Sequence, residues 1–136
     1  MYHPWRRLRE QPNIQLTWRP LLGRLGVTDG RSRVVLDPRQ SQAQRRCTIA
    51  HELAHIELGH VRGCDPREES AAAQLAARRL IPIAQLADAI LWSEHPAQIA
   101  EALWVDVDTL QVRLDHLHPS ERQYIAQRLA AREDGA

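Results

Sequence analysis

The chain has 136 residues, enough for one domain with a hydrophobic core or for one domain with a small appendage. Apolar residues make up 43% and charged residues 26%, as in an ordinary soluble protein, and the net charge of +1 provides no strong basic field for nucleic acid. The sequence contains neither a run of eighteen apolar residues nor the apolar stretch of a signal peptide, so we expect a cytoplasmic protein without a membrane span. We also expect its two cysteines, Cys47 and Cys64, to be reduced, with Cys47 as a small buried residue rather than a metal ligand.

The first third of the chain predicts a small antiparallel sheet. The first twelve residues are basic, contain two prolines and suit a short helix or a loose arm. Residues 14–18 alternate between apolar and polar side chains, as a half-buried strand does. Residues 24–28 and 31–36 flank Asp29-Gly30, a pair that tolerates the positive φ angles of a tight primed turn, and therefore predict a hairpin.

The next stretch predicts a helix with a metal site on one face. Ser41 and Gln44 have the spacing of a capping box at its start, and a glycine follows its last turn. His51 and His55 lie four residues apart, so that on a helix their imidazoles share one face and can bind the same Zn²⁺. Glu52, between them, can reach a water at the metal rather than the metal itself, which suits a general base. The alternative is an ordinary amphipathic helix with two solvent-facing histidines.

A second helix can supply the third zinc ligand. Asp65-Pro66 predicts its start, with Asp as the N-cap and Pro in the first helical position. Glu69 follows in the first turn and is the candidate ligand, although a carboxylate there also suits the helix dipole. His60 is the rival. It lies five residues after His55, about 140° around the helix, and can join the pair only if the chain turns at Gly59.

The last third of the chain carries a second helical pattern. Residues 96–118 resemble a helix-turn-helix, in which Asp108 could cap the second helix. Asp106, Asp108 and Asp115 would then face DNA phosphates, which disfavours DNA binding. We therefore interpret the pair as part of the hydrophobic core, followed by a last amphipathic helix over residues 121–132.

A family resemblance rests on the residues of both site helices. Thr48 to His55 contain His-Glu-x-x-His, Leu58-Gly59-His60 follows, and Glu69-x-x-Ala72 leads into Ala76-Ala77-x-x-Leu80-Ile81-Pro82. Over about residues 30–118 the chain resembles the ImmA/IrrE family of gluzincin-type metallopeptidases, as a small member of phage or actinobacterial type. The resemblance implies that His51, His55 and Glu69 bind zinc and that Glu52 is the general base.

Two positions depart from the family pattern. Ala73 stands where the family has Asp or Asn, and Leu75 where it has a bulky aromatic residue. The first change removes a side chain that could orient a zinc ligand. A register shifted by one residue would make Glu68 the ligand, but it would misplace Ala72 and the Leu-Ile-Pro ending. A donor to the developing oxyanion is also expected, and His60, Tyr124 and several arginines remain candidates.

These observations predict an α+β fold in one domain, residues 1–136. A small three-stranded antiparallel sheet at 14–36 packs on a mostly helical, zincin-like body, with the zinc-site helices at 41–81. The predicted function is zinc-dependent hydrolysis of a peptide bond, and by resemblance the substrate would be a repressor protein of a mobile element, phage or stress regulon. One alternative is a zinc-containing regulator that binds a repressor or DNA without cleaving it. Another is a phage structural component with a chance motif. An intact Glu52 favours the peptidase, because a structural zinc site does not require it.

Overall fold

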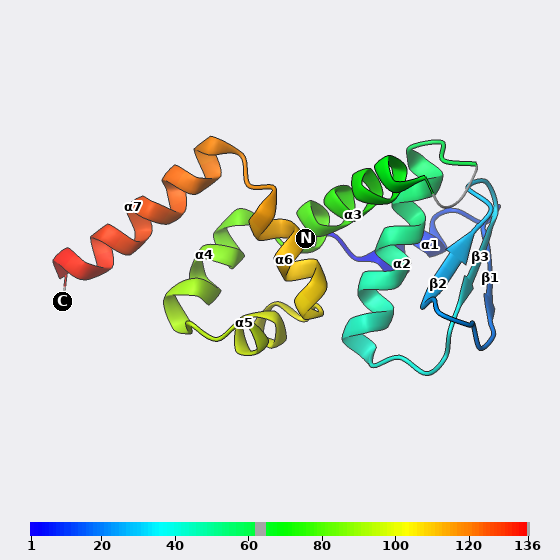
Figure 1. Ribbon diagram of the computed structural model, residues 1–136, viewed down its shortest axis with the longest axis horizontal. Helices are drawn as coiled ribbons and strands as arrows, with labels where there is room; N and C mark the ends of the chain where they lie inside the picture. Colours follow the sequence, from blue (N-terminus) through cyan, green and yellow to red (C-terminus); the bar gives the residue numbers. More distant parts are fainter. Residues whose placement is uncertain (62–64, 136) are drawn as a thin grey trace.

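The fold, seen in a computed structural model that describes residues 1–61 and 65–135, is α+β, as the sequence predicts (Figure 1). The small sheet lies at one end and the helices extend from it toward the other. Cys64, for which a reduced thiol was predicted, lies outside the described residues. The elements are α1 (Pro4–Arg9), β1 (Gln15–Trp18), β2 (Gly26–Thr28), β3 (Arg33–Leu36), α2 (Gln42–Glu57), α3 (Pro66–Leu80), α4 (Ile83–Trp92), α5 (Pro96–Leu103), α6 (Val107–Asp115) and α7 (Pro119–Gly135).

The sheet is mixed, so the prediction of a purely antiparallel sheet was wrong. The strand order is β1-β3-β2, with β2 antiparallel to β3 and β1 parallel to it. The hairpin occupies one edge of β3, which leaves the other edge for β1. The chain leaves β1 beside Leu36 and must cross to the far edge before β2 begins, and this crossing makes β1 run parallel to β3. Asp37 holds the crossing loop, because its carboxylate accepts the Leu21 N–H at 2.9 Å.

The predicted hairpin is present, but its turn is longer than a two-residue primed turn. The carboxylate of Asp29 accepts the backbone N–H groups of Arg31, Ser32 and Arg33 at 2.9–3.0 Å. Gly30 alone in this turn has a positive φ, of 78°. One side chain therefore satisfies three backbone donors, which fixes a wider loop than the sequence pattern suggested.

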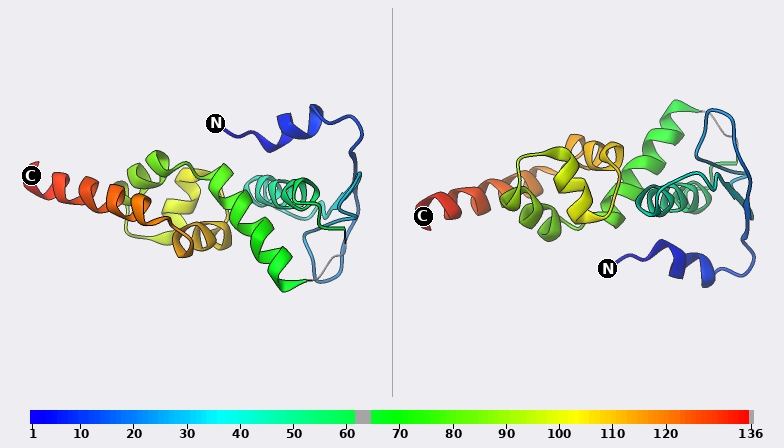
Figure 2. Two further views of the ribbon diagram at one scale, coloured as in Figure 1. Left: turned by 90° about the horizontal axis from the view of Figure 1, so that it is seen from above. Right: turned by 90° about the horizontal axis from the view of Figure 1, so that it is seen from below.

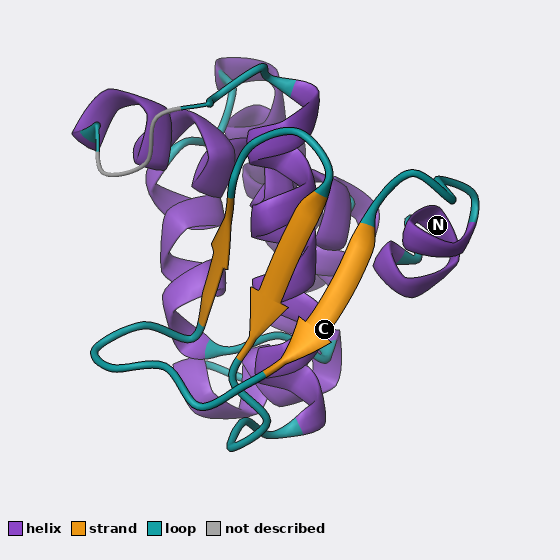
Figure 3. Ribbon diagram, turned by 90° about the vertical axis from the view of Figure 1, so that its right-hand side faces the viewer, coloured by secondary structure: helices purple, strands orange, loops and turns teal. Residues whose placement is uncertain are grey.

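Helix α2 forms the centre of the fold, between the sheet and α3. Its start has the predicted capping box, in which Ser41 and Gln44 each accept the other's backbone N–H. Ile49 and Leu53 pack against Val34 and Leu36 of the sheet. The sheet covers the helices on one side of the molecule (Figure 3). A helix covered on two faces is held in a fixed orientation, and this orientation determines where its histidines point.

The remaining helices form a second hydrophobic cluster, which includes Leu80, Ile81, Leu86, Leu103 and Leu110. Helices α5 and α6 are adjacent, as the helix-turn-helix pattern predicts. The N-cap of α6 is Asp106, however, whose carboxylate accepts the Thr109 N–H at 2.7 Å, and not Asp108 as the sequence analysis suggested. Helix α7 begins two residues earlier than predicted and forms the end of the molecule opposite the sheet (Figure 2), where Arg128 pairs with Asp88 of α4. Among the described residues, no helix is long and apolar enough to cross a membrane.

Candidate metal centre

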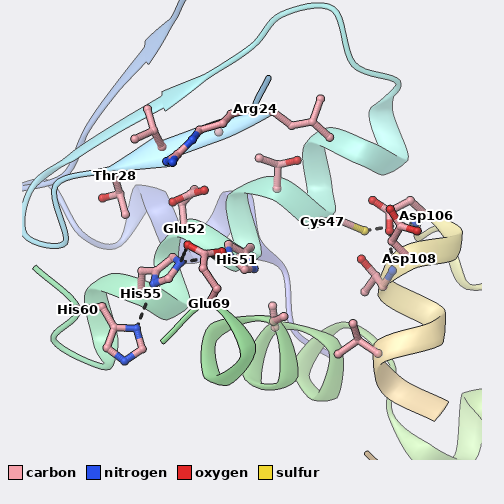
Figure 4. Close-up of a pocket in the computed structure, with 18 residues that line it drawn as sticks. Arg24, Thr28, Cys47, His51, Glu52, His55, His60, Glu69, Asp106 and Asp108 are labelled. Carbon is pink, nitrogen blue, oxygen red and sulfur yellow. Dashed lines mark hydrogen bonds and ion pairs between the residues drawn. The ribbon is translucent and has the colours of Figure 1, made fainter. Parts of the chain in front are cut away.

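Two helices bring the three predicted ligands together. His51 and His55 project from α2, and Glu69 reaches them from the first turn of α3 (Figure 4). One Glu69 oxygen lies 3.0 Å from His51 Nε2, and the other lies 2.9 Å from His55 Nε2. The two Nε2 atoms are 3.1 Å apart.

Alanines explain why the two helices approach so closely. Ala50 and Ala54 on α2, and Ala72 and Ala76 on α3, are all buried. A methyl side chain keeps the helix axes near each other, so a short carboxylate on one helix reaches imidazoles on the other. The alanine-rich pattern after Glu69 is therefore part of how the sequence builds the site.

The donor set fits zinc. Two imidazole nitrogens and one carboxylate oxygen are a common ligand set of catalytic zinc, and they leave a fourth position open. The three donor atoms lie within 4.8 Å of one another. Ligands about 2.1 Å from a tetrahedral ion are about 3.4 Å apart, so small side-chain movements would enclose a metal ion. The burial of His55 and the nearby charge of His51 lower the pKa of His55, which favours the neutral, metal-binding imidazole.

Glu52 lies on α2 beside these ligands but outside the cluster that they form. Only 6% of the residue is exposed. Burial raises the pKa of its carboxyl to about 8, the charge of Glu69 adds to this effect, and the charge of Arg24 opposes it. A carboxyl group with a pKa near neutrality can both accept and donate a proton, as acid–base catalysis requires.

The approach of β2 accounts for the burial of Glu52. A Cβ atom on Gly26 would lie 2.5 Å from the Thr48 methyl group and 3.1 Å from Glu52 Oε1. Only glycine therefore allows the strand to pass so close to the carboxyl group. The alternating pattern of residues 24–28 predicts a hairpin strand but does not indicate this close approach to α2.

The alternative ligands lie around the cluster and not in it. His60 Nδ1 is 3.0 Å from His55 Nδ1, on the side of that ring that faces away from Glu69. Glu68 Oε2 lies 3.6 Å from the same His60 nitrogen. Cys47 is buried, as predicted, and its sulfur accepts the Asp106 N–H at 3.4 Å.

An open cavity of about 550 Å³ runs along the cluster and is bounded by β2, α2, α3 and α6. Sequence reasoning did not place Arg24 or Thr28 there, because it does not show which face of a short strand meets a helix. Asp106 and Asp108, which were considered only as groups facing DNA, also line this cavity (Figure 4). Tyr124 lies on α7, where it accepts a hydrogen bond from Arg128. The lining residues are Arg24, Leu25, Gly26, Val27, Thr28, Cys47, Thr48, His51, Glu52, His55, His60, Glu69, Ala73, Ala76, Asp106, Asp108, Thr109 and Val112.

Comparison with known proteins agrees with this architecture. The family model Peptidase_M78, described as the IrrE N-terminal-like domain, matches residues 10–115, most of the chain. Comparisons with curated proteins and with solved structures gave no match. The matched region contains the sheet, both site helices and the α5–α6 pair. The chain therefore belongs to the ImmA/IrrE family, a family of peptidases.

Proposed function

We propose that this protein is a zinc-dependent peptidase in which His51, His55 and Glu69 hold the metal and Glu52 is the general base. Its family supports a metallopeptidase-type function and a protein substrate. The observation that carries the proposal is the meeting of the three donors in a cavity that also contains Glu52. If the two histidines of α2 did not bind a metal, the fold would have no need to place a carboxylate from a second helix beside both of them.

The residues of the cavity have separable tasks in this reaction. Zinc held by the three donors would supply a Lewis acid that acidifies water and polarises the peptide carbonyl. Glu52 would take the proton from the attacking water and pass it to the leaving nitrogen. Its burial keeps bulk water from the carboxyl group, so that the proton remains available for the second transfer.

The shape of the cavity suits an extended peptide. Strand β2 is at an edge of the sheet, and all three of its residues, Gly26 to Thr28, line the cavity. An edge strand can pair with an extended chain through backbone hydrogen bonds, which hold a substrate with little dependence on its sequence. Following the family resemblance, the substrate we propose is a repressor or another regulatory protein.

Two adjacent glutamates provide a matched test of the metal site. Glu69→Ala should lose most of the zinc, because it removes one of three ligands. Glu68→Ala should keep about one zinc per chain, because its carboxylate faces His60 and not the cluster. Both proteins should be purified in parallel and analysed for metal content. Equal zinc in Glu69→Ala and wild type would show that Glu69 is not a ligand.

Glu52→Gln tests the chemistry. Glutamine has nearly the same shape but cannot take a proton from water at neutral pH. We expect zinc to remain bound while hydrolysis falls by about 10²–10⁴-fold, the usual contribution of general acid–base catalysis. A repressor encoded beside the gene is the first substrate to test, with zinc content measured on the same sample. Undiminished cleavage by zinc-loaded Glu52→Gln would contradict the assignment of the base.

A non-catalytic zinc regulator is the second candidate function. The observation that favours it is Ala73, which lines the cavity beside the metal cluster at a position where the resembling family has Asp or Asn. The missing side chain could have oriented a ligand, and its loss weakens a catalytic zinc site more than a binding surface. Tight binding of a partner by zinc-loaded protein, without cleavage, would favour this function.

A further inference from the structure

We propose that His60 is a positioning residue for the zinc ligand His55. In this arrangement His60 Nδ1 accepts a hydrogen bond from His55 Nδ1–H, and His55 is thereby left with Nε2 free to bind the metal. The inference rests on the proposed zinc site, but it concerns metal affinity and ring tautomers, which can be measured without any peptidase assay.

The end of α2 brings His60 back toward His55. On a continued helix the two side chains would point about 140° apart. Gly59 instead has a φ of 75°, in the left-handed region that glycine adopts without strain. The Gly59 N–H donates to the Ile56 carbonyl at 3.1 Å, and the His60 N–H donates to the His55 carbonyl at 3.0 Å. This C-terminal turn of the helix reverses the chain and places the His60 ring next to the His55 ring.

The ring atoms are placed for one hydrogen bond. The two Nδ1 atoms are 3.0 Å apart, and the ring planes meet at 65°. A neutral imidazole has one N–H and one lone pair, so a His55 that binds metal through Nε2 carries its proton on Nδ1. That proton needs an acceptor, and the lone pair of His60 Nδ1 is at the correct distance. His60 must then carry its own proton on Nε2.

Burial strengthens the hydrogen bond between His55 and His60. The exposed fractions of the two side chains are 7% for His55 and 14% for His60, so water competes poorly for the hydrogen bond. Glu68 Oε2 is 3.6 Å from His60 Nδ1, beyond the usual range of a hydrogen bond. His60 Nδ1 is therefore placed to hydrogen-bond His55 rather than the Glu68 carboxylate.

The sheet holds the backbone of His60 in place from the other side. Gly30, in the turn between β2 and β3, is buried and lies directly against the His60 carbonyl, so that a Cβ atom there would collide with it. His60 is thus fixed both by the end of α2 and by the hairpin turn. A fixed backbone restricts the positions that the His60 ring can take, which is what an orienting group requires.

Zinc dissociation constants test the proposal. Loss of such an orienting partner typically weakens metal binding 10–100-fold, and we expect this in His60→Ala. In His60→Asn the side-chain oxygen can occupy the place of Nδ1, so the constant should stay within about threefold of wild type. His95→Asn is the control, because His95 is exposed at the start of α5, far along the chain from the site. The constants would be measured by competition with a chelator of known affinity.

Nitrogen NMR of zinc-loaded wild type gives a second test that needs no variant. We expect His55 to bind zinc through Nε2 and to show a slowly exchanging Nδ1 proton, with His60 protonated on Nε2. Zinc binding through His55 Nδ1, or equal zinc affinity in His60→Ala and wild type, would overturn the proposal while leaving the zinc site intact. Failure of wild type itself to bind zinc would overturn the proposed metal site, and the positioning role with it.

Discussion

The buried carboxyl group of Glu52 should make the stability of the metal-free protein fall as the pH rises. Its pKa is about 8 in the folded protein, against an ordinary value of 4.5, chiefly because of burial and secondarily because of the Glu69 charge. Between these two values the folded protein keeps a proton that the unfolded chain has lost. The stability linked to this group is therefore fully present below pH 4.5 and is lost as the pH rises through 8.

The size of the effect follows from the same two values. Each pH unit between the two pKa values corresponds to about 1.4 kcal/mol of folding stability. The whole interval therefore gives an upper bound of about 5 kcal/mol for the stability linked to Glu52. The stability of a domain of this kind is about 5–15 kcal/mol. Replacing Glu52 with Gln removes the titration but keeps the shape of the side chain. At pH 8.5 the free energy of unfolding of metal-free Glu52→Gln should therefore exceed that of wild type by several kcal/mol. The difference should shrink toward pH 5.

Urea unfolding in the presence of a chelator measures this difference. Wild type and Glu52→Gln should be compared at pH 5.5, 7 and 8.5, with helical circular dichroism as the signal. The lowered pKa of His55 changes stability in the opposite direction, but it is present in both proteins, so the comparison isolates Glu52. Two stability curves that stay parallel from pH 5.5 to 8.5 would refute the argument.

Three further predictions concern the sheet, the site helix and the α5–α6 pair. Gly26→Ala should lower stability by about 1–3 kcal/mol, because its Cβ would press on the stiff Thr48 side chain, and an unchanged melting temperature would contradict this. Ser41→Ala should cost about 1 kcal/mol through loss of the capping box, again seen in thermal melting, whereas Ser41→Asn should not. The protein should not shift duplex DNA at physiological salt, given its charge of +1; a shift that survives excess competitor DNA would show the opposite.

Local signals in the sequence were enough to predict most helices and the candidate ligands. The capping box at Ser41, the proline at the start of α3 and the four-residue spacing of His51 and His55 depend only on neighbours along the chain. Such patterns follow from backbone geometry and can be read without knowing the tertiary structure. The choice of Glu69 over Glu68 came from the family pattern, since helical spacing alone does not show which of the two glutamates is the ligand.

The features that sequence reasoning missed all depend on contacts between distant segments. The parallel pairing of β1 depends on which edge of β3 the hairpin leaves open, and no residue of β1 specifies that. Asp106 and Asp108 are both acceptable caps, and the choice follows from where the chain leaves α5. Arg113 lies in the helix-turn-helix pattern, but it is buried, donates to the Ile81 carbonyl and pairs with Glu121, so it is not exposed to DNA.

The sheet contributes none of the three candidate ligands, yet one glycine in β2 and one in the hairpin turn determine the surroundings of the site. Gly26 lets β2 approach closely enough to bury Glu52, and Gly30 lets the hairpin turn press on the backbone of His60. The first contact acts on the proposed base and the second on the proposed partner of a zinc ligand. A side chain at either glycine would therefore alter the site without touching a ligand. The small sheet is thus better understood as the part of the fold that positions the chemistry of α2 than as a separate support for the helices.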